Sequence, residues 1–131
     1  MILDTTFIID LLRGNNLKVK EKAEELDHLF ETKAVASISI MELWRGALQS
    51  VRKEEEKNKI NELIKSFLVY PFDEKTARES GEIEADLIKR GEIIDLEDIM
   101  ISGVAKVHNE KVLTRNVKHF KRIRGLSVET Y

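Results

Sequence analysis

The stretch that decides the fold is MILDTTFIIDLL, residues 1–12. Met1, Ile2 and Leu3 are apolar, and a longer apolar run follows from Phe7, so the whole segment is suited to a protein core. Asp4 interrupts it, although a carboxylate is almost never buried without a partner. The short apolar run predicts a buried strand, and Asp4 lies where this strand ends and a helix begins. Asp4 is therefore the first candidate site residue.

The rest of the chain alternates short apolar, β-branched runs with longer amphipathic ones. The runs that predict strands are residues 1–3, 34–38, 67–72, 111–114 and 126–129. Strands separated by helices favour an α/β fold, in which helices cover both faces of a parallel sheet. The length of 131 residues indicates a single domain, 1–131, because single domains usually contain about 100–150 residues.

Apolar residues at helical spacing predict the faces that the helices bury. The predicted faces are Val19/Ala23/Leu26/Phe30, Met41/Trp44/Leu48/Val51, Ile60/Leu63/Ile64/Phe67 and Ala77/Gly81/Ala85/Ile88. The last of these consists mostly of small residues, which indicates a helix packed close to its neighbour. Residues 99–107 are apolar nearly all round, as in a buried helix.

Composition excludes several classes of protein. The absence of Cys excludes disulfides, thiolate zinc sites and cysteine nucleophiles. A net charge of −2 argues against a polycation that coats nucleic acid, so any phosphate contact requires a local basic patch. No apolar stretch reaches the roughly 20 residues of a membrane span, and Asp4 and Asp10 interrupt the only stretch placed as a signal peptide would be. We expect a soluble cytoplasmic protein.

Each further candidate residue also has a purely structural explanation. Asp4 is a preferred N-cap, and Glu42 completes an S-x-x-E capping-box pattern. Asp98 follows Asp95 at the head of the buried helix, where the helix dipole favours carboxylates, and Asp95 itself is a good cap. Asn116, two residues after the strand KVLT, is another preferred cap type.

Taken together, these residues point to a metal. Asp4, Glu42 and Asn116 all lie just beyond the carboxyl end of a predicted strand, where open α/β sheets bind ligands. The carboxylates of Asp4, Glu42 and Asp98 would repel one another there unless a cation lay between them. Hard oxygen ligands suit Mg²⁺ or Mn²⁺. The sequence therefore predicts a metal site at this edge, which explains why Asp4 ends a core strand.

Four blocks, in order, resemble the PIN-domain ribonucleases. MILDTTFIIDLL resembles the family's opening, in which the first strand ends in Asp-Thr. ISIMELWRG, residues 38–46, resembles the second block, with Glu42 as its acid. EDIMISGVA, residues 97–105, is similar to the third, in which an Asp heads a buried helix. VLTRNVKHFKRIRGLSVETY, residues 112–131, resembles the closing block of VapC-type toxins of type II toxin–antitoxin pairs.

This resemblance implies an α/β/α sandwich with a parallel sheet of four to five strands. It also implies Mg²⁺-dependent cleavage of RNA, with Mn²⁺ as a substitute, by a homodimer that a VapB-type antitoxin binds. Asp4, Glu42 and Asp98 are then the metal ligands, and Asn116 completes the catalytic set, with Thr5 orienting the attacking water or the phosphate. Two departures from the family pattern are Thr6, where Asn or Ser is commoner, and Asn116, whose amide replaces an acid of many relatives.

Charge placement predicts where RNA would lie. Residues 106–124 contain seven Lys or Arg against a single acid. Of these, Arg115, Lys118, Lys121 and Arg122 follow or flank Asn116, and we expect them to bind the RNA backbone. The alternative is an ordinary solvated face of a Lys-rich protein. The three histidines, His28, His108 and His119, are expected at the surface or at helix ends.

Three other functions remain open at this stage. A receiver-like signalling domain also binds Mg²⁺ at the acidic edge of a parallel sheet, but it needs a strand-end Lys and a central phosphoacceptor Asp that this sequence does not offer. A nucleotide-binding module is disfavoured because there is no G-x-G-x-x-G or P-loop pattern. A catalytically silent PIN scaffold is the third alternative, and the intact acids argue against it.

Overall fold

A computed structural model describes residues 1–131 and contains one five-stranded parallel sheet. The strand order is β3-β2-β1-β4-β5, so that the first strand lies at the centre between β2 and β4. The strands are short: β1 (Ile2–Leu3), β2 (Ala34–Ala36), β3 (Leu68–Tyr70), β4 (Val112–Leu113) and β5 (Val128–Glu129). All five predicted strands are confirmed, each trimmed at its ends.

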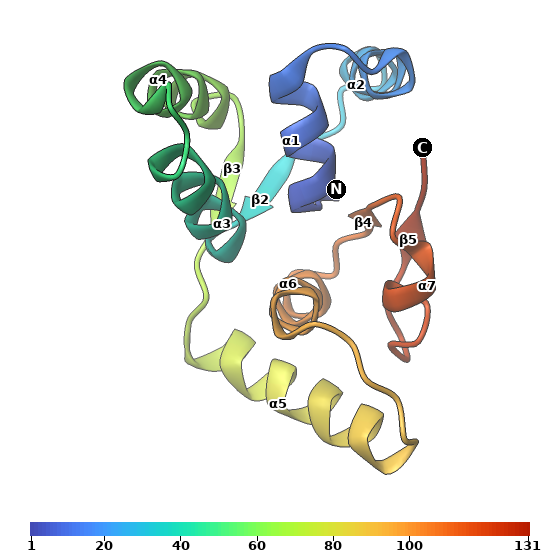
Figure 1. Ribbon diagram of the computed structural model, residues 1–131. Helices are drawn as coiled ribbons and strands as arrows, with labels where there is room; N and C mark the ends of the chain where they lie inside the picture. Colours follow the sequence, from blue (N-terminus) through green and yellow to red (C-terminus); the bar gives the residue numbers. More distant parts are fainter.

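Seven helices cover the sheet on both faces (Figure 1). Helices α1 to α4 lie on one face, and α6 and α7 lie on the other, with α5 packed outside α6. The predicted α/β/α arrangement is therefore confirmed. The helices are α1 (Thr5–Arg13), α2 (Leu17–His28), α3 (Ser37–Leu48), α4 (Lys53–Ile64), α5 (Glu74–Lys89), α6 (Leu96–Val107) and α7 (Val117–Phe120). No helix combines the length and apolarity that crossing a bilayer requires.

Alternating side chains of the strands divide the core between the two faces. Leu3 and Val35 belong to the core beneath α1 to α4, whereas Ile2 and Val112 belong to the core beneath α6 and α7. Successive residues of a strand point to opposite faces, so these strands must be apolar at every position. Strand β1 ends at Leu3, and Asp4 is the first residue beyond it.

The predicted buried face of α5 was wrong. Ala77, Gly81, Ala85 and Ile88 are exposed. The buried side chains of α5 are those of Thr76, Ser80, Ile83 and Leu87. The exposed set is related to the buried set by a shift of about one position along the helix, so α5 is turned by roughly a quarter of a turn from the predicted orientation.

Helices α5 and α6 do approach each other closely, but the small residue at the contact belongs to α6. A Cβ atom added to Gly103 would lie 2.0 Å from Ser80 Oγ and 3.0 Å from the carbonyl oxygen of Thr76. No heavy atom lies within 4 Å of the corresponding position at Gly81. The packing of α5 on α6 therefore depends on the missing side chain of Gly103.

Two other predicted faces were partly wrong. Phe30 lies beyond the end of α2, has a φ of 53° and is 94% exposed, so it does not extend the α2 stripe. Met41, Leu48 and Val51 are also exposed, because α3 buries Ile38, Leu43 and Ala47 instead. Of the predicted α3 stripe, only Trp44 packs against the core.

Candidate metal centre

Asp4 is buried at the carboxyl end of β1, where three donors satisfy its carboxylate. It is 3% exposed. Its Oδ1 atom accepts the backbone N–H of Thr5 at 2.8 Å, and its Oδ2 atom accepts the hydroxyls of Thr6 at 2.9 Å and of Thr114 at 2.7 Å. Asp4 thus caps α1, as its structural explanation predicted, and is also fixed by a hydroxyl from the end of β4.

Glu42 is not part of a capping box. The N-cap of α3 is Ala36, which makes no side-chain cap bond, and Ser39 lies inside the helix. The carboxylate of Glu42 instead accepts the hydroxyl of Thr5 at 2.8 Å. Since Thr5 directly follows Asp4, this bond links the acid of α3 to the acid at the end of β1.

Asn116 and Asp98 meet on the other side of Asp4. The backbone N–H of Asn116 donates to Thr114 Oγ1 at 2.9 Å, and its amide nitrogen lies 3.5 Å from Asp98 Oδ2. Asn116 precedes α7 but makes no side-chain cap bond. Asp98 lies in the first turn of α6, one turn after the N-cap Asp95, which likewise makes no side-chain cap bond. Capping therefore does not account for the side chains of Asp95 or Asn116.

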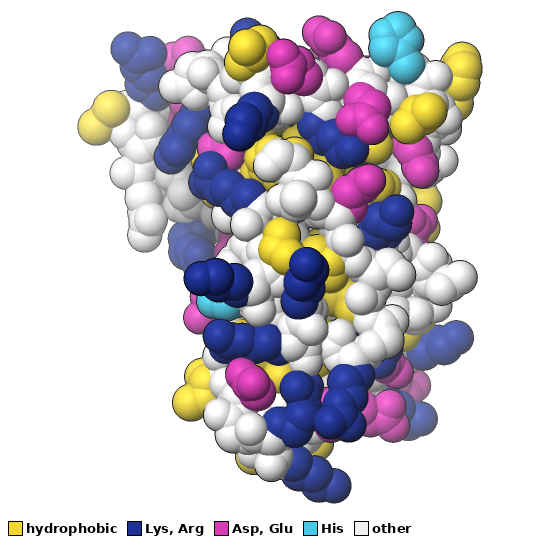
Figure 2. All heavy atoms as spheres, turned by 90° about the vertical axis from the view of Figure 1, so that its right-hand side faces the viewer, with side chains coloured by type: hydrophobic (Ala, Val, Ile, Leu, Met, Phe, Trp, Pro, Cys, Tyr) yellow, Lys and Arg dark blue, Asp and Glu magenta, His cyan; other side chains and the backbone are white.

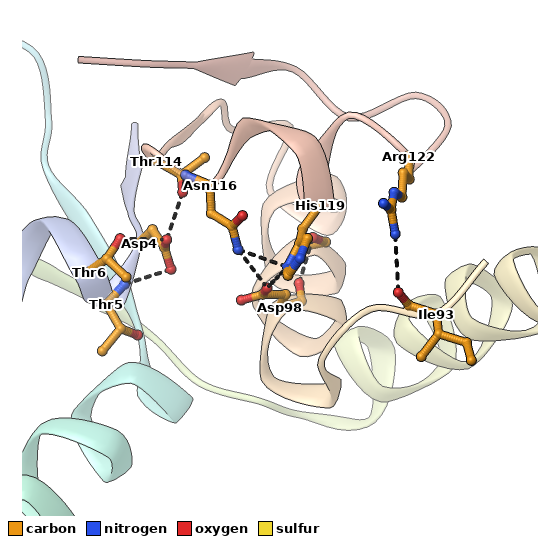
Figure 3. A network of polar contacts seen from close by, with 10 residues as sticks. Asp4, Thr5, Thr6, Ile93, Asp98, Thr114, Asn116, His119 and Arg122 are labelled. Carbon is orange, nitrogen blue, oxygen red and sulfur yellow. Dashed lines mark hydrogen bonds and ion pairs between the residues drawn. The ribbon is translucent and has the colours of Figure 1, made fainter.

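These contacts form a continuous polar chain across the sheet edge, referred to below as the edge chain. Its members, in order, are Glu42, Thr5, Asp4, Thr114, Asn116 and Asp98. Figure 3 shows the part from Thr5 to Asp98, with residues contributed by α1, α6 and the segment that follows β4. The four predicted catalytic residues thus lie along one connected set of contacts.

His119 also belongs to this site, and sequence reasoning missed it. It was expected at the surface or at a helix end, with no role in the site. It does lie in the last turn of α7 and is 34% exposed, but its Nδ1 atom lies 3.1 Å from Asp98 Oδ2. The same nitrogen lies 2.8 Å from the amide nitrogen of Asn116 (Figure 3). The available signal was the spacing of three residues between Asn116 and His119, which brings both side chains to one side of a helical turn.

The site contains one compact group of potential metal ligands. One ligand atom from each of Asp95, Asp98 and His119 lies within 4.8 Å of the other two. Asp4 and Glu42 lie outside this group and are connected to it through the edge chain. The structure thus places the three predicted metal ligands on one edge, and it adds Asp95 and His119 beside Asp98.

Electrostatics favour a cation at this edge. Burial raises the pKa of the Glu42 carboxyl, and the nearby charges of Glu97 and Asp4 raise it further. Burial also raises the pKa of the Asp98 carboxyl, where Asp4 and Asp95 add to the effect. Both groups therefore resist ionisation in the folded protein. Carboxylate oxygens that are crowded in this way fit a hard divalent cation.

The predicted basic residues divide into two kinds. Arg115 forms an ion pair with the buried Asp10 at 2.9 Å. Arg122 lies 3.4 Å from a Glu92 oxygen and donates to the carbonyl oxygen of Ile93 at 3.2 Å. In contrast, Lys118 and Lys121 are exposed and form no ion pair. Figure 2 shows the face seen from the side of α7 and β5, where Lys and Arg side chains gather across the middle and lower part.

Comparison with known proteins identifies relatives of the whole chain. A sequence model of the family described as the PIN domain matches residues 1–126. Ribonuclease VapC2 of Rickettsia felis is 32% identical over 117 residues, which cover 89% of this chain and 82% of the relative. The tRNA(fMet)-specific endonuclease VapC of Salmonella typhimurium is 30% identical over 117 residues, which cover 86% of this chain and 89% of the relative.

A solved structure is similar to this one over nearly the full length. It is the crystal structure of VapBC2 from Rickettsia felis bound to a DNA fragment from their promoter. The superposition has a TM-score of 0.91 at 28% sequence identity and covers 99% of this chain and 97% of the other.

Proposed function

The chain belongs to the PIN-domain family of VapC ribonucleases, and on that premise we propose that it is an endoribonuclease, the toxin of a VapBC-type pair. Residues 1–131 would form its single PIN domain, which hydrolyses RNA phosphodiester bonds at the sheet edge that bears Asp4, Glu42 and Asp98. The observation that carries this proposal is the edge chain, because it aligns the predicted catalytic residues along one line of contacts.

PIN nucleases are metal-dependent, and the donor set of this site fits a divalent cation. We propose Mg²⁺, with Mn²⁺ as a substitute, held by Asp4, Glu42 and Asp98. When bound, such a cation polarises the scissile phosphate and lowers the pKa of a coordinated water. The protein's own part is to hold the three carboxylates in place. Thr114 and Thr6 do this for Asp4 through their hydroxyls.

Two residues of the site then have separate roles. Thr5 was expected to contact water or substrate, but it is 5% exposed and its hydroxyl is used by Glu42, so we assign it to the positioning of that carboxylate. Asn116 is partly exposed, and its amide is the group that can orient a water or a phosphate oxygen beside Asp98.

We also propose that the protein acts in the cytoplasm as a homodimer bound by a VapB-type antitoxin. Support comes from the similarity to VapBC2 of Rickettsia felis, which was solved as a complex with promoter DNA. In addition, Ile88, Ile93 and Leu96 are exposed apolar side chains around the segment that joins α5 to α6, and a bound partner would remove them from water.

The central test is dependence on a metal. Protein purified free of any antitoxin should cleave a defined RNA in Mg²⁺ or Mn²⁺, and cleavage should stop in EDTA and return when Mg²⁺ is added in excess. The readout is the appearance of discrete fragments on a denaturing gel. The Asp4→Asn variant, prepared in parallel, controls for contaminating ribonucleases.

Two results would contradict this proposal. Cleavage that persists in excess EDTA would exclude a metal-dependent mechanism. RNA binding without cleavage, in every divalent cation tested, would instead favour the catalytically silent scaffold.

A second test concerns Lys118 and Lys121, the two predicted RNA-binding residues that form no ion pair, unlike Arg115 and Arg122. Changing both to Ala should weaken binding of single-stranded RNA. It should also lower the slope of log K against log salt by about 1.4, because each phosphate contact contributes about 0.7. The measurement is a fluorescence-anisotropy titration at several salt concentrations, in Ca²⁺ to slow cleavage.

The matched control is the Lys18→Ala, Lys20→Ala variant, which removes two exposed lysines from α2 without altering α7. An equal change in slope for both double variants would assign Lys118 and Lys121 to an ordinary solvated face.

A further inference from the structure

We propose that the imidazole of His119 is itself a metal ligand, and that it raises the affinity of this site for divalent transition ions such as Mn²⁺ and Co²⁺ relative to its affinity for Mg²⁺. The inference rests on the proposed metal-dependent function and concerns how tightly each cation binds. It starts from the contacts among three atoms: Asp98 Oδ2, His119 Nδ1 and the amide nitrogen of Asn116.

The hydrogen bonds among these three atoms depend on whether Nδ1 carries a proton. If Nδ1 carries a proton, it can donate to Asp98 at 3.1 Å, but it then faces the N–H groups of the Asn116 amide at 2.8 Å. If Nδ1 is unprotonated, it accepts from Asn116, but its lone pair then faces the carboxylate oxygen of Asp98. Turning the amide of Asn116 over removes the first conflict, because Nδ1–H can then donate to both the amide oxygen and Asp98 Oδ2. The second arrangement keeps its conflict.

A cation removes the conflict in the second arrangement. The lone pairs of Nδ1 and Oδ2 would both point at the ion, and the amide of Asn116 would keep its donor role. Two adjacent ligands of an octahedral ion at about 2.1 Å from it lie about 3.0 Å apart. The observed separation of Nδ1 and Oδ2 is 3.1 Å, so these two atoms need little movement to share an ion.

Asp95 supports the same assignment. Its carboxylate makes no cap bond to α6, although it is at the N-cap position. A ligand atom of Asp95 instead lies within 4.8 Å of those of Asp98 and His119. One nitrogen and two carboxylate oxygens thus converge from α7 and the first turn of α6.

The nitrogen donor determines which ions gain affinity. Carboxylate and water oxygens suit Mg²⁺, whereas imidazole favours transition ions, whose affinity rises from Mn²⁺ to Co²⁺ and beyond. A site of oxygen ligands alone would bind Mg²⁺ and Mn²⁺ with less discrimination. With His119 as a ligand, this one side chain determines the ratio of the Mn²⁺ affinity to the Mg²⁺ affinity.

The experiment is a calorimetric titration of Mn²⁺ and of Mg²⁺ into the full-length protein without antitoxin. The His119→Ala and His119→Gln variants should each lower Mn²⁺ affinity by at least about tenfold, because the loss of a residue that merely supports a ligand already has such an effect. Mg²⁺ affinity should change much less. The controls are His28→Ala and His108→Ala, since His28 ends α2 and His108 stacks on Tyr70 at the far end of α6.

A spectroscopic readout needs no variant. Two-bond ¹H–¹⁵N spectra of the histidine rings should show, with one equivalent of Zn²⁺ as a diamagnetic probe, a shift of the Nδ1 resonance of His119 and an Nε2–H tautomer. The resonances of His28 and His108 should stay in place. If a His119 variant fails to fold, this measurement still tests whether His119 Nδ1 binds the metal.

The outcomes separate this inference from the proposed function. If both His119 variants keep the Mn²⁺ to Mg²⁺ ratio and the Nδ1 resonance does not move, while Asp98→Asn abolishes binding, the inference is overturned and the metal centre stands. If Asp98→Asn binds metal normally and RNA is cleaved in EDTA, the proposed function itself fails.

Discussion

Replacing Asp98 with Asn should reduce RNA cleavage by about 100-fold or more, whereas the metal-free protein should melt at the same temperature as the parent or higher. Asn keeps the shape of the side chain and removes an anionic oxygen that a divalent cation needs. Two readouts on one preparation test the prediction: a melting curve in EDTA and a cleavage assay in Mg²⁺.

The expected gain in stability follows from the direction of the pKa shift. Burial, together with Asp4 and Asp95, raises the pKa of Asp98 above its ordinary value. Its charged form is therefore less favourable in the folded protein than in the unfolded chain. Folding then loses stability as the pH rises through the folded pKa, so at neutral pH the neutral Asn should fold at least as well as the carboxylate.

The matched control is Glu84→Gln, which removes one negative charge from an exposed position of α5. It should change neither cleavage nor melting temperature. Full activity of Asp98→Asn would exclude Asp98 from the site, and unfolding of that variant would favour a structural role. A trade of activity for stability at this position would match the behaviour of strained functional sites.

Replacing Gly103 with Ala should destabilise the protein by about 1–3 kcal/mol, the usual effect of overpacking a filled core. The added methyl group would meet Ser80 Oγ at 2.0 Å and the Thr76 carbonyl oxygen at 3.0 Å. The hydroxyl can move, but the carbonyl belongs to the backbone of α5. Urea denaturation at constant m-value measures the change in the free energy of unfolding.

The Gly81→Ala substitution, in α5, should have the opposite effect on stability. Nothing lies within 4 Å of its Cβ position, so the substitution should stabilise the protein by about 0.5–1 kcal/mol through helix propensity. Adding Ser80→Ala to Gly103→Ala should recover part of the loss, because it removes the nearest atom. Equal stability of the Gly103 and Gly81 variants would show that the two helices can move apart at little cost.

The order of strands and helices was predictable because elements that line the core need apolar residues at a characteristic spacing. Strands that are buried on both faces have to be apolar at every position, and all five predicted runs form strands. The face of α5 was not predictable from apolarity. Thr76 and Ser80 are buried there because their hydroxyls bond within the helix, to the carbonyl oxygens of Asp73 and Thr76. Because these two residues are polar, a pattern of apolar residues could not identify the face of α5 that packs on α6.

Much of the candidate site was predictable from where the strands end. Asp4, Glu42 and Asn116 follow strands whose carboxyl ends share one edge. His119 was missed because α7 has only four residues and so offers no periodic pattern. The partner of Arg115 could not be inferred either, since the ion pair with Asp10 depends on how α1 lies beside the end of β4.

The central place of β1 in the sheet has a consequence for the timing of activity in the cell. Its neighbours are β2 and β4, and the hydroxyl of Thr114 that fixes Asp4 is 110 residues away along the chain. During synthesis, the first acid and Glu42 leave the ribosome long before Asp98 and Asn116. Contacts between such distant segments form late in folding. A nascent or truncated chain that ends before β4 therefore carries Asp4, Glu42 and Asp98 without Thr114 and Asn116, which join them. We expect it to be inert until its last segment is made.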